Sequence, residues 1–476
     1  MKLSTARLAA LSALLLEGAL AASSGNFDVL TINVAGLPAI LNENGVPGDK
    51  ATNAATMGAK FSQHGIDIVQ LQEVSRHRLL APLAVSRLSP GPGTLTHRRQ
   101  DFNYHAHIYR TNTHPHRTAT SGGVPFGSGL NTVSYLPWVD FRRIKWNKCS
   151  DASQSDCLTP KGFTFMRVAI SSDSSTAAYV DFYNLHADAG VEPGDLVARN
   201  DNMKQVADYI AAWSKGNAVV VAGDFNSRYT RTGDTGIRDF LASENPSGPG
   251  LKDAWVELLY SNVIPQSPSS CGNPAANDLC EIVDKVFYRG SPLLNLRATD
   301  TRYDTSRFLQ DNGDVLTDHN PVHVNFTWSS GASLRQSSLF GGPHGSWFSD
   351  VPVLAGINKP KAATIDFRGA SRLDGVGVTL TDGTRFTHGG SGGTAASLAL
   401  GANEYWTQAE LCTGQRSGRT RNFYIRAVTS SGRSLTSGTS TSDCQTFVAP
   451  SGWQIVGFVG QDGSEVDQLA FVYAPR

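Results

Sequence analysis

The chain has 476 residues, which is too long for one ordinary hydrophobic core and predicts at least two domains. Its 41 basic residues are balanced by 41 acidic residues. Proteins that bind nucleic acids or anionic membranes usually carry an excess of positive charge, so the composition supports neither class.

The first 22 residues are predicted to be a secretory signal peptide. Lys2 and Arg7 precede an apolar stretch over 8–16, and residues 19–21 have the small-x-small pattern of a cleavage site. Glu17 departs from that pattern, and a buried first helix is the alternative. No later segment has the ~20 apolar residues that a membrane-spanning helix needs, so we expect a secreted protein without a transmembrane segment.

Six short apolar stretches in the first two thirds of the chain are predicted to be strands. They cover 27–34, 66–73, 179–186, 218–224, 282–288 and 321–328. Helical stretches alternate with these strands, which predicts a layered α/β domain over 26–328.

The clearest helix in this region follows Asp195, which is placed to cap it. Gly216 is predicted to end it. Four apolar residues lie on one face of the predicted helix: Leu196, Met203, Val206 and Ile210.

The six cysteines fall into three local groups, which are Cys149 with Cys157, Cys271 with Cys280, and Cys412 with Cys444. Three disulfides in an oxidising compartment are the natural interpretation, although sequence alone leaves the pairing open. A zinc site is the rival interpretation for a close pair. It is disfavoured because no second pair follows at zinc-ligand spacing.

The composition changes after residue 328. Residues 329–337 are rich in Ser and Gly and are predicted to be a linker. Beyond them, 338–476 is rich in Gly, Ser and Thr with short alternating runs, such as the predicted hairpin over 375–390. We expect a second, all-β domain there.

Polar side chains gather at or just after the ends of the six predicted strands of the first domain. They are Asn33, Glu73, His186, Asp224, Asn226, Asp284, Asp318 and His319. Each alone has an ordinary structural explanation, such as a turn, an ion pair or a buried histidine. Together they predict a site for a hard divalent cation, because clustered carboxylates repel one another unless a cation lies among them.

The stretches that carry these residues resemble, in order, the motifs of the endonuclease/exonuclease/phosphatase superfamily, whose fold is called DNase I-like. The stretches are TINVAGLP, DIVQLQEV, FYNLHAD, VVAGDFNSR, IVDKVFYR and LTDHNPVHV. The resemblance implies a four-layered, two-sheet sandwich flanked by helices, and hydrolysis of phosphoesters. Neutral sphingomyelinases and nucleases both belong to this superfamily.

The resemblance also implies a role for each residue. Glu73 and Asn33 correspond to metal ligands, together with Asp318 of the terminal Asp-His pair. His186, Asp224, Asn226, Asp284 and His319 correspond to catalytic residues.

Three details of that assignment concern individual residues. Asp284 corresponds to the carboxylate that orients the His319 imidazole, and the choice of general base between His319 and Asp224 stays open. Asn131 corresponds to a phosphate contact, with a turn residue as the alternative. Mg²⁺ is the expected cofactor, and Mn²⁺ or Ca²⁺ would suit the same oxygen ligands.

The second domain resembles jacalin-related lectins, which are β-prisms. The resemblance rests on the opening LFGGPHGSWFSD and on the closing loop over 463–467. It implies a carbohydrate site at Gly342, Glu465 and Asp467, and the alternative is that the closing loop is only a hairpin turn.

The sequence therefore predicts a secreted, metal-dependent phosphodiesterase of nuclease or sphingomyelinase type with an appended carbohydrate-binding domain. The alternative from another class is a lectin that carries an inactive hydrolase scaffold. The identities of the substrate, the metal and the sugar stay open at this stage.

Overall fold

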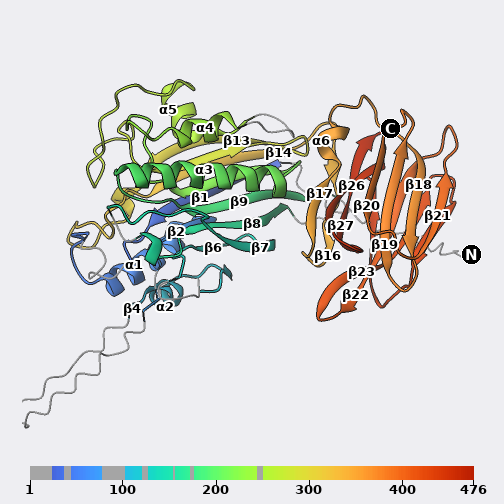
Figure 1. The fold of residues 1–476 in the computed structure, drawn as a ribbon, viewed down its shortest axis with the longest axis horizontal. Helices are drawn as coiled ribbons and strands as arrows, with labels where there is room; N and C mark the ends of the chain where they lie inside the picture. The colour runs from blue at the N-terminus through green and yellow to red at the C-terminus, as the bar shows by residue number, and fades with distance from the viewer. Residues whose placement is uncertain are drawn as a thin grey trace, which may run out of the picture.

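A computed structural model describes residues 24–36, 44–74, 76–77, 102–120, 127–153, 156–171, 176–243 and 250–476 (Figure 1). The predicted signal peptide lies outside the described residues. Among the helices of these ranges, none has the length and apolar character needed to cross a membrane.

The N-terminal domain is built on two six-stranded sheets. The strands of the first sheet, in spatial order, are β13 Leu294–Tyr303, β14 Val322–Ser330, β1 Ser24–Asn33, β2 Ile68–Gln72, β6 Asn131–Ser134 and β5 His116–Arg117. Those of the second are β11 Lys252–Asp253, β12 Asp284–Arg289, β10 Ala218–Asp224, β9 Ala178–His186, β8 Gly162–Ser171 and β7 Trp138–Lys145. The short strands β3 Arg76–His77 and β4 Phe102–Asn103 pair with each other.

The two sheets pack face to face, because alternate residues of each are buried against the other. Phe27 and Val324 of the first sheet share one apolar cluster with Phe182, Val220 and Val286 of the second. The predicted strands are all present, and their ends differ from the predicted ones by at most three residues.

Helices cover both outer faces of the sandwich (Figure 1). Helices α1 Lys50–Gln63 and α2 Tyr104–Thr111 pack on the first sheet, and α3 Pro193–Trp213, α4 Gly236–Ala242 and α5 Ala254–Tyr260 pack on the second. Two short 3-10 helices, η1 Asp156–Leu158 and η2 Thr305–Arg307, lie in the connections. The layers therefore run helix, sheet, sheet, helix, which confirms the predicted four-layered α/β fold.

The prediction for α3 was wrong at its start. The helix begins at Pro193 after Glu192, so Asp195 is the third helical residue rather than the cap. Its carboxylate accepts a hydrogen bond from the Glu192 amide at 3.1 Å and closes the first turn from inside. At the other end the helix stops at Trp213, and Gly216 has a φ of 84°.

The C-terminal domain is a prism of three antiparallel sheets around one core. The first sheet contains β15 Arg335–Gln336, β27 Val466–Pro475, β26 Trp453–Asp462 and β17 Ser346–Ser349, and β16 Phe340–Gly341 pairs with β27. The second contains β20 Arg385–Gly389, β19 Leu373–Leu380, β18 Ala362–Gly369 and β21 Thr394–Ala399. The third contains β24 Ser434–Gly438, β23 Arg419–Thr429, β22 Trp406–Arg416 and β25 Asp443–Val448, and one short helix, α6 Val351–Leu354, follows β17.

All three sheets contribute to the core of the prism, which includes Val376, Trp406, Ile425 and Phe471. This confirms the predicted all-β prism. The predicted linker over 329–337 contains the end of β14 and all of β15.

The three disulfides join the cysteines within each predicted group. Cys149 is bonded to Cys157, Cys271 to Cys280, and Cys412 to Cys444. The prediction of three disulfides is therefore confirmed, and the pairing that the sequence left open lies within the three local groups.

The two domains share a buried contact at the end of the sandwich where β9 begins. Arg167 donates to both carboxylate oxygens of Asp181, at 2.8 and 2.9 Å, and its guanidinium carbon lies 3.4 Å from the ring centre of Trp347 in the prism. The Trp347 indole donates to the Lys215 carbonyl at 3.1 Å. The far end of β9, at His186, lies five residues beyond Asp181, about 17 Å away at the rise of a strand.

A buried histidine in β14 makes the stability of the N-terminal domain depend on pH. The His323 ring lies 2.9 Å from Asp304 and 3.2 Å from Asp28, and it is 2% exposed. Burial alone would lower its pKa, but hydrogen bonds to Asp28 and Asp304 outweigh burial and raise the pKa. The imidazolium is therefore stabilising at pH values below about 6.5, where the unfolded histidine is also charged, and this contribution is lost as the pH rises through the folded pKa.

We expect His323→Gln to lower the free energy of unfolding by about 1–2 kcal/mol at pH 5.5 and by less at pH 9. Urea denaturation at the two pH values measures the difference. Equal losses at both would contradict a charged role for this residue.

Candidate active site and carbohydrate site

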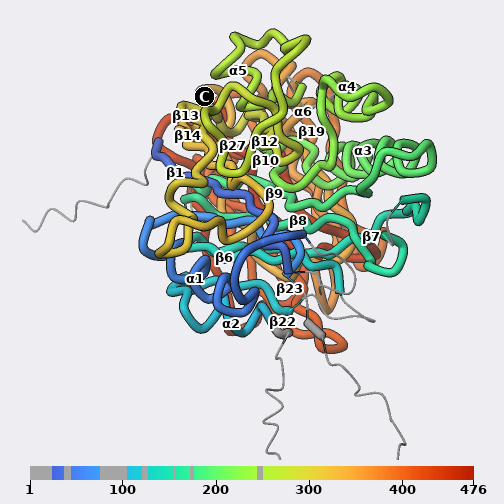
Figure 2. The backbone as a smooth tube through the Cα atoms, turned by 90° about the vertical axis from the view of Figure 1, so that its left-hand side faces the viewer, coloured from blue at the N-terminus to red at the C-terminus, as the bar shows by residue number. Residues whose placement is uncertain are grey.

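Five strands bring their polar residues to one end of the sandwich. Asn33 ends β1 and pairs in register with Gln72, the residue before Glu73. In the second sheet, Asp224 ends β10 and pairs with His186 of the parallel strand β9 and with Asp284 of the antiparallel strand β12. Figure 2 looks onto this end of the molecule, where β12, β10 and β9 are neighbours in the second sheet and β1 belongs to the first.

The Asn33 amide joins the two sheets across the site. Its Nδ2 donates to Glu73 Oε1 at 3.0 Å and to Asp224 Oδ2 at 3.2 Å, while its Oδ1 accepts from the Ala35 amide. Glu73 and Asp224 are therefore held on either side of one carboxamide.

The backbone holds Glu73 in a conformation that is uncommon for a residue with a side chain. Its φ is 57°, in the left-handed region. Gly36 and Gly129 pack against it so closely that a Cβ on Gly36 would lie 2.2 Å from the Glu73 carbonyl oxygen, and one on Gly129 would lie 3.0 Å from its Cα. Such strain persists only where the surroundings fix it, and it is common at functional sites.

Burial raises the pKa of Glu73, and the nearby Asp318 carboxylate raises it further, whereas the hydrogen bond from Asn33 lowers it. Glu73 is 9% exposed, while Asp318 is exposed at the rim. A negative charge at Glu73 is thus costly unless a cation lies beside it.

The His319 imidazole lies between two carboxylates. Its Nδ1 is 2.7 Å from Asp284 Oδ2, and its Nε2 is 3.8 Å from Asp224 Oδ2. Burial opposes a charged ring, but Asp284, Asp224 and Asp318 outweigh burial and hold the pKa of His319 well above its usual value. Burial raises the pKa of Asp284 to about 6.

The pKa of the second imidazole, His186, is shifted in the opposite direction. Burial and the charge of Lys161 lower the pKa of His186 to about 3, although its Nε2 lies 3.4 Å from Asp224 Oδ2. The surroundings therefore shift the pKa values of the two imidazoles beside Asp224 in opposite directions. Environments that separate the pKa values of two such groups are typical of acid–base sites.

The side chains at this end fit a divalent cation. Asp224, Asp284 and His319 offer ligand atoms that all lie within 4.8 Å of one another. Within the part of the chain that the structure describes, the buried Asp284 Oδ1 has no hydrogen-bond partner. Asn33 links Glu73 to this cluster through Asp224. Because the donors are mostly oxygens, the set suits Mg²⁺, Mn²⁺ or Ca²⁺.

Two further predicted residues are Asn226, which contacts Asp224, and Asn131, which begins β6. The Asn226 amide N–H donates to Asp224 Oδ1 at 2.9 Å, and its side chain donates to the Ala187 carbonyl at 3.1 Å. Asn131 is fully buried, and its side chain lies 2.7 Å from His105 Nε2 and accepts from Thr118 at 3.3 Å. The catalytic role of Asn226 and the phosphate-binding role of Asn131 stay predictions.

The three predicted residues of the carbohydrate site lie together at one end of the prism. The Gly342 amide donates to the Asp467 carbonyl at 3.0 Å. Asp467 lies 2.7 Å from Arg421, and Glu465 is paired with Arg416 at 2.5 Å and with Arg372. Burial raises the pKa of Asp467 to about 6.

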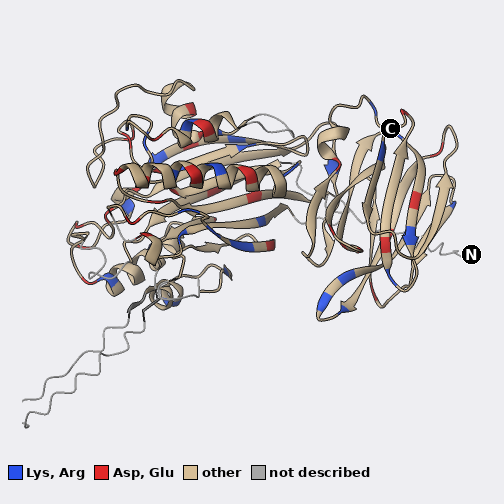
Figure 3. Cartoon of the chain, viewed as in Figure 1, with Lys and Arg blue, Asp and Glu red and all other residues tan. Residues whose placement is uncertain are grey.

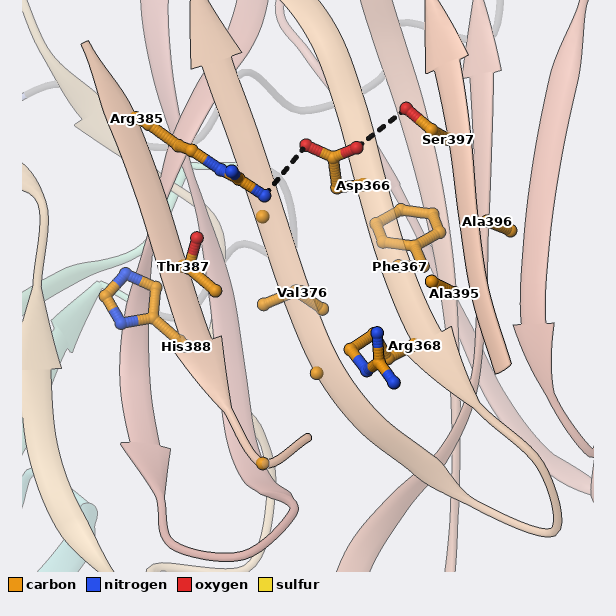
Figure 4. A pocket seen from close by; sticks show the side chains of 13 residues that line it. Asp366, Phe367, Arg368, Val376, Arg385, Thr387, His388, Ala395, Ala396 and Ser397 are labelled. Carbon is orange, nitrogen blue, oxygen red and sulfur yellow. Dashed lines mark hydrogen bonds and ion pairs between the residues drawn. The ribbon is translucent and has the colours of Figure 1, made fainter. Parts of the chain in front are cut away.

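A separate groove of about 190 Å³ lies on the outer face of the sheet that contains β18 to β21 (Figure 4). Its floor contains Gly377, and its polar side chains contact one another. Asp366 accepts from Ser397 at 2.7 Å and lies 3.9 Å from Arg385. The groove is therefore distinct from the site at Gly342, Glu465 and Asp467.

Comparison with protein families separates the chain into the same two parts. Residues 61–268 match the endonuclease/exonuclease/phosphatase family 2, and residues 337–472 match the jacalin-like lectin domain. The chain contains an endonuclease/exonuclease/phosphatase domain followed by a jacalin-like lectin domain. The first match stops short of Asp284 and His319, which the fold places in the same sandwich.

Among curated proteins, the chain is 31% identical over 310 residues to sphingomyelinases of Mycobacterium bovis and Mycobacterium tuberculosis. The match covers 64% of this chain and 53% of each relative, so the chain spans about half the length of the relatives that it matches.

Solved structures are similar to each domain separately. Sphingomyelinase C from Streptomyces griseocarneus is 16% identical, with a TM-score of 0.39, and the match covers 63% of this chain and 99% of that one. A mannose-binding jacalin-related lectin from Ananas comosus is 21% identical, with a TM-score of 0.26, and the match covers 30% of this chain and 99% of that one.

Sequence reasoning missed a lysine in the endonuclease/exonuclease/phosphatase domain. Lys161 is 7% exposed, lies 2.8 Å from Asp156, and influences the pKa values of Glu73, His186 and Asp224. It immediately precedes β8, whose first residue pairs with His186. That pairing is the only signal that could have identified Lys161, and it is not visible in the local sequence.

In the lectin domain, sequence reasoning missed the arginines. Arg372, Arg416 and Arg421 all lie in ion pairs with the two predicted sugar-binding carboxylates. Figure 3 shows basic residues gathered on the hairpin between β22 and β23. A carboxylate-centred sugar motif gives no indication of which cations will surround it.

Proposed function

We propose that the chain is a secreted, divalent-cation-dependent phosphodiesterase that cleaves sphingomyelin, with a lectin domain that holds it on glycosylated surfaces. The observation that carries the enzymatic part is the convergence of Glu73, Asp224, Asp284 and His319 at one end of the sandwich. The 31% identity to mycobacterial sphingomyelinases supports this substrate over a nucleic acid, as does the balanced charge of the chain. The predicted signal peptide and three disulfides support secretion.

In this proposal His319 takes the proton of the attacking water at Nε2, because Asp284 fixes its Nδ1. Asp224 is a poorer base. Both of its oxygens accept hydrogen bonds, from Asn226 and Asn33. Although burial alone would raise its pKa, His319, His186 and Lys161 outweigh burial and lower it.

Two further groups face the charge that develops on the phosphate. His186 is neutral, so it can donate one hydrogen bond to a phosphoryl oxygen without carrying a charge into the site. The buried Lys161 ammonium contributes positive potential on the same side.

Glu73, Asn33 and Asp318 would hold the cation, which we propose to be Mg²⁺, with Mn²⁺ or Ca²⁺ as alternatives. The ion would neutralise charge on the phosphate and offset the negative field that holds a proton on His319.

The test is hydrolysis of sphingomyelin vesicles, plasmid DNA and a chromogenic phosphodiester by the purified protein, each with Mg²⁺ and with EDTA. We expect cleavage of sphingomyelin that needs the cation and is absent in His319→Ala. Cleavage of DNA without cleavage of sphingomyelin would assign the enzyme to the nuclease branch of the superfamily. No turnover on any substrate, with glycan binding intact, would favour a lectin on an inactive scaffold.

The lectin part of the proposal rests on Asp467 and on the Gly342 loop beside it. A tethered lectin raises the local concentration of the enzyme near substrate on the same surface. We expect Asp467→Ala to lower glycan binding at least about tenfold, the loss of one charge-assisted hydrogen bond. Binding of the variant to a glycan array measures this loss. Its turnover of a soluble substrate is measured in parallel and should be unchanged.

A further inference from the structure

The hairpin between β22 and β23 forms one wall of the carbohydrate site that we proposed at Gly342, Glu465 and Asp467. A Cβ on Gly342 would lie 2.6 Å from the Thr420 carbonyl oxygen, and the Asn422 amide donates to the Phe340 carbonyl at 3.2 Å. The hairpin therefore packs directly on the glycine loop. Arg416, Arg419 and Arg421 belong to this hairpin, at or next to its turn.

The two carboxylates of the site are already paired with cations. Glu465 contacts Arg372 and Arg416, and Asp467 contacts Arg421. Both carboxylates are at most 5% exposed. Because guanidinium groups contact both carboxylates, the negative charge of the carboxylates is offset and the arginines form the outer part of the site.

The outer surface of the site is therefore positive. Arg416 binds Glu465 through one guanidinium nitrogen, and its side chain is 49% exposed, so other N–H donors face solvent. Arg419 is exposed, and in the fully described range 250–476 it makes no ion pair. Burial raises the pKa of Asp467 and lowers that of His344, and the Arg419 charge lowers both pKa values, so this charge reaches the site.

The charged side chains around the site also carry a net positive charge. Arg372, Arg416, Arg419 and Arg421 surround three carboxylates, those of Glu465, Asp467 and Asp462. Asp462 is engaged separately, accepting the Gly389 amide at 2.6 Å.

We propose that this site binds an acidic saccharide, one that carries a carboxylate or a sulfate, and that Arg416 and Arg419 contact its anionic group. The inference rests on the proposed carbohydrate-binding role of the site and specifies its ligand class. Guanidinium groups suit these anions because two parallel N–H donors match two oxygens.

The test compares binding of the full-length protein to glycans that differ only in the acidic group, such as sialyllactose and lactose, and a sulfated saccharide and its desulfated form. We expect the wild type to prefer the acidic member of each pair, with affinity that falls as salt rises. Arg419→Gln and the double variant Arg416→Gln/Arg419→Gln should weaken that binding at least about tenfold. Arg426→Gln removes an exposed arginine elsewhere on β23 and should leave binding unchanged.

The outcomes separate this inference from the lectin function itself. Binding of neutral and acidic glycans with equal affinity, lost in Asp467→Ala, would uphold the lectin and overturn the acidic preference. Acidic binding that survives in both arginine variants would also overturn it. If the folded wild type binds no glycan of either kind, the proposed lectin function fails and the inference fails with it. Because Arg419 makes no ion pair with the described residues, its single variant is informative even if the double variant does not fold.

Discussion

Glu73→Gln is expected to lower the turnover number at least about a thousandfold, which corresponds to about 4 kcal/mol of lost transition-state stabilisation. The substitution keeps the size of the side chain and the oxygen that accepts from Asn33 Nδ2, but it removes the charge. Burial raises the pKa of the Glu73 carboxyl, so the charge destabilises the metal-free fold. A residue kept at such a cost is expected to act through its charge.

Two measurements separate this role from a structural one. Hydrolysis at saturating Mg²⁺ gives the loss in turnover. Thermal melts in EDTA and in Mg²⁺ give the second readout, because a cation that binds only the folded state raises the melting temperature. The wild type should be stabilised by Mg²⁺, and Glu73→Gln should not.

In EDTA, Glu73→Gln should melt at the same temperature as the wild type or higher. Asp208→Asn removes an exposed carboxylate on α3 and is the matched control for loss of charge. If Glu73→Gln retained Mg²⁺ stabilisation and near-normal turnover, another group would have to be the principal metal ligand.

The fold of the N-terminal domain could be predicted because its strands are buried on both faces and are therefore apolar along their length. The run from Ala218 to Ala222 is an example, and the polar Asp224 shows where such a strand reaches the edge of the sheet. Residues at the ends of neighbouring strands must meet, so the site residues carried by these strands could be predicted together. The predicted binding of a divalent cation followed from the number and type of these site residues.

Residues that reach a site through strand pairing or from a neighbouring hairpin could not be predicted in this way. Lys161 lies at the centre only because β8 pairs with β9 in one particular register. Arg421 and Glu465 are far apart in sequence, and they meet because the β22–β23 hairpin packs on the sheet that contains β27. Asp195 was placed as a helix cap because an acidic residue before an apolar repeat is typical of one, yet Pro193 starts the helix two residues earlier.

The pair formed by Asp284 and His319 gives the second large prediction. His319→Ala and Asp284→Asn are each expected to lower turnover by about 10²–10⁴-fold, the usual contribution of a positioned general base. With Asp284 the ring must present N–H at Nδ1, which leaves Nε2 free to accept a proton. An amide at position 284 can instead donate to Nδ1, which fixes the proton on Nε2 and removes the acceptor.

Because both substitutions disable the same group, their effects should not add. The double variant is expected to turn over no more slowly than His319→Ala alone, so the double-mutant cycle should give a coupling close to the whole effect of Asp284→Asn. Additive losses would mean that Asp284 acts independently of the ring, through a cation or through the fold. Action through a cation is the rival explanation, because Asp284 Oδ1 has no hydrogen-bond partner among the residues that the structure describes. Measuring the Mg²⁺ concentration for half-maximal activity in Asp284→Asn decides between them, since a positioning role leaves that concentration unchanged and a ligand role raises it.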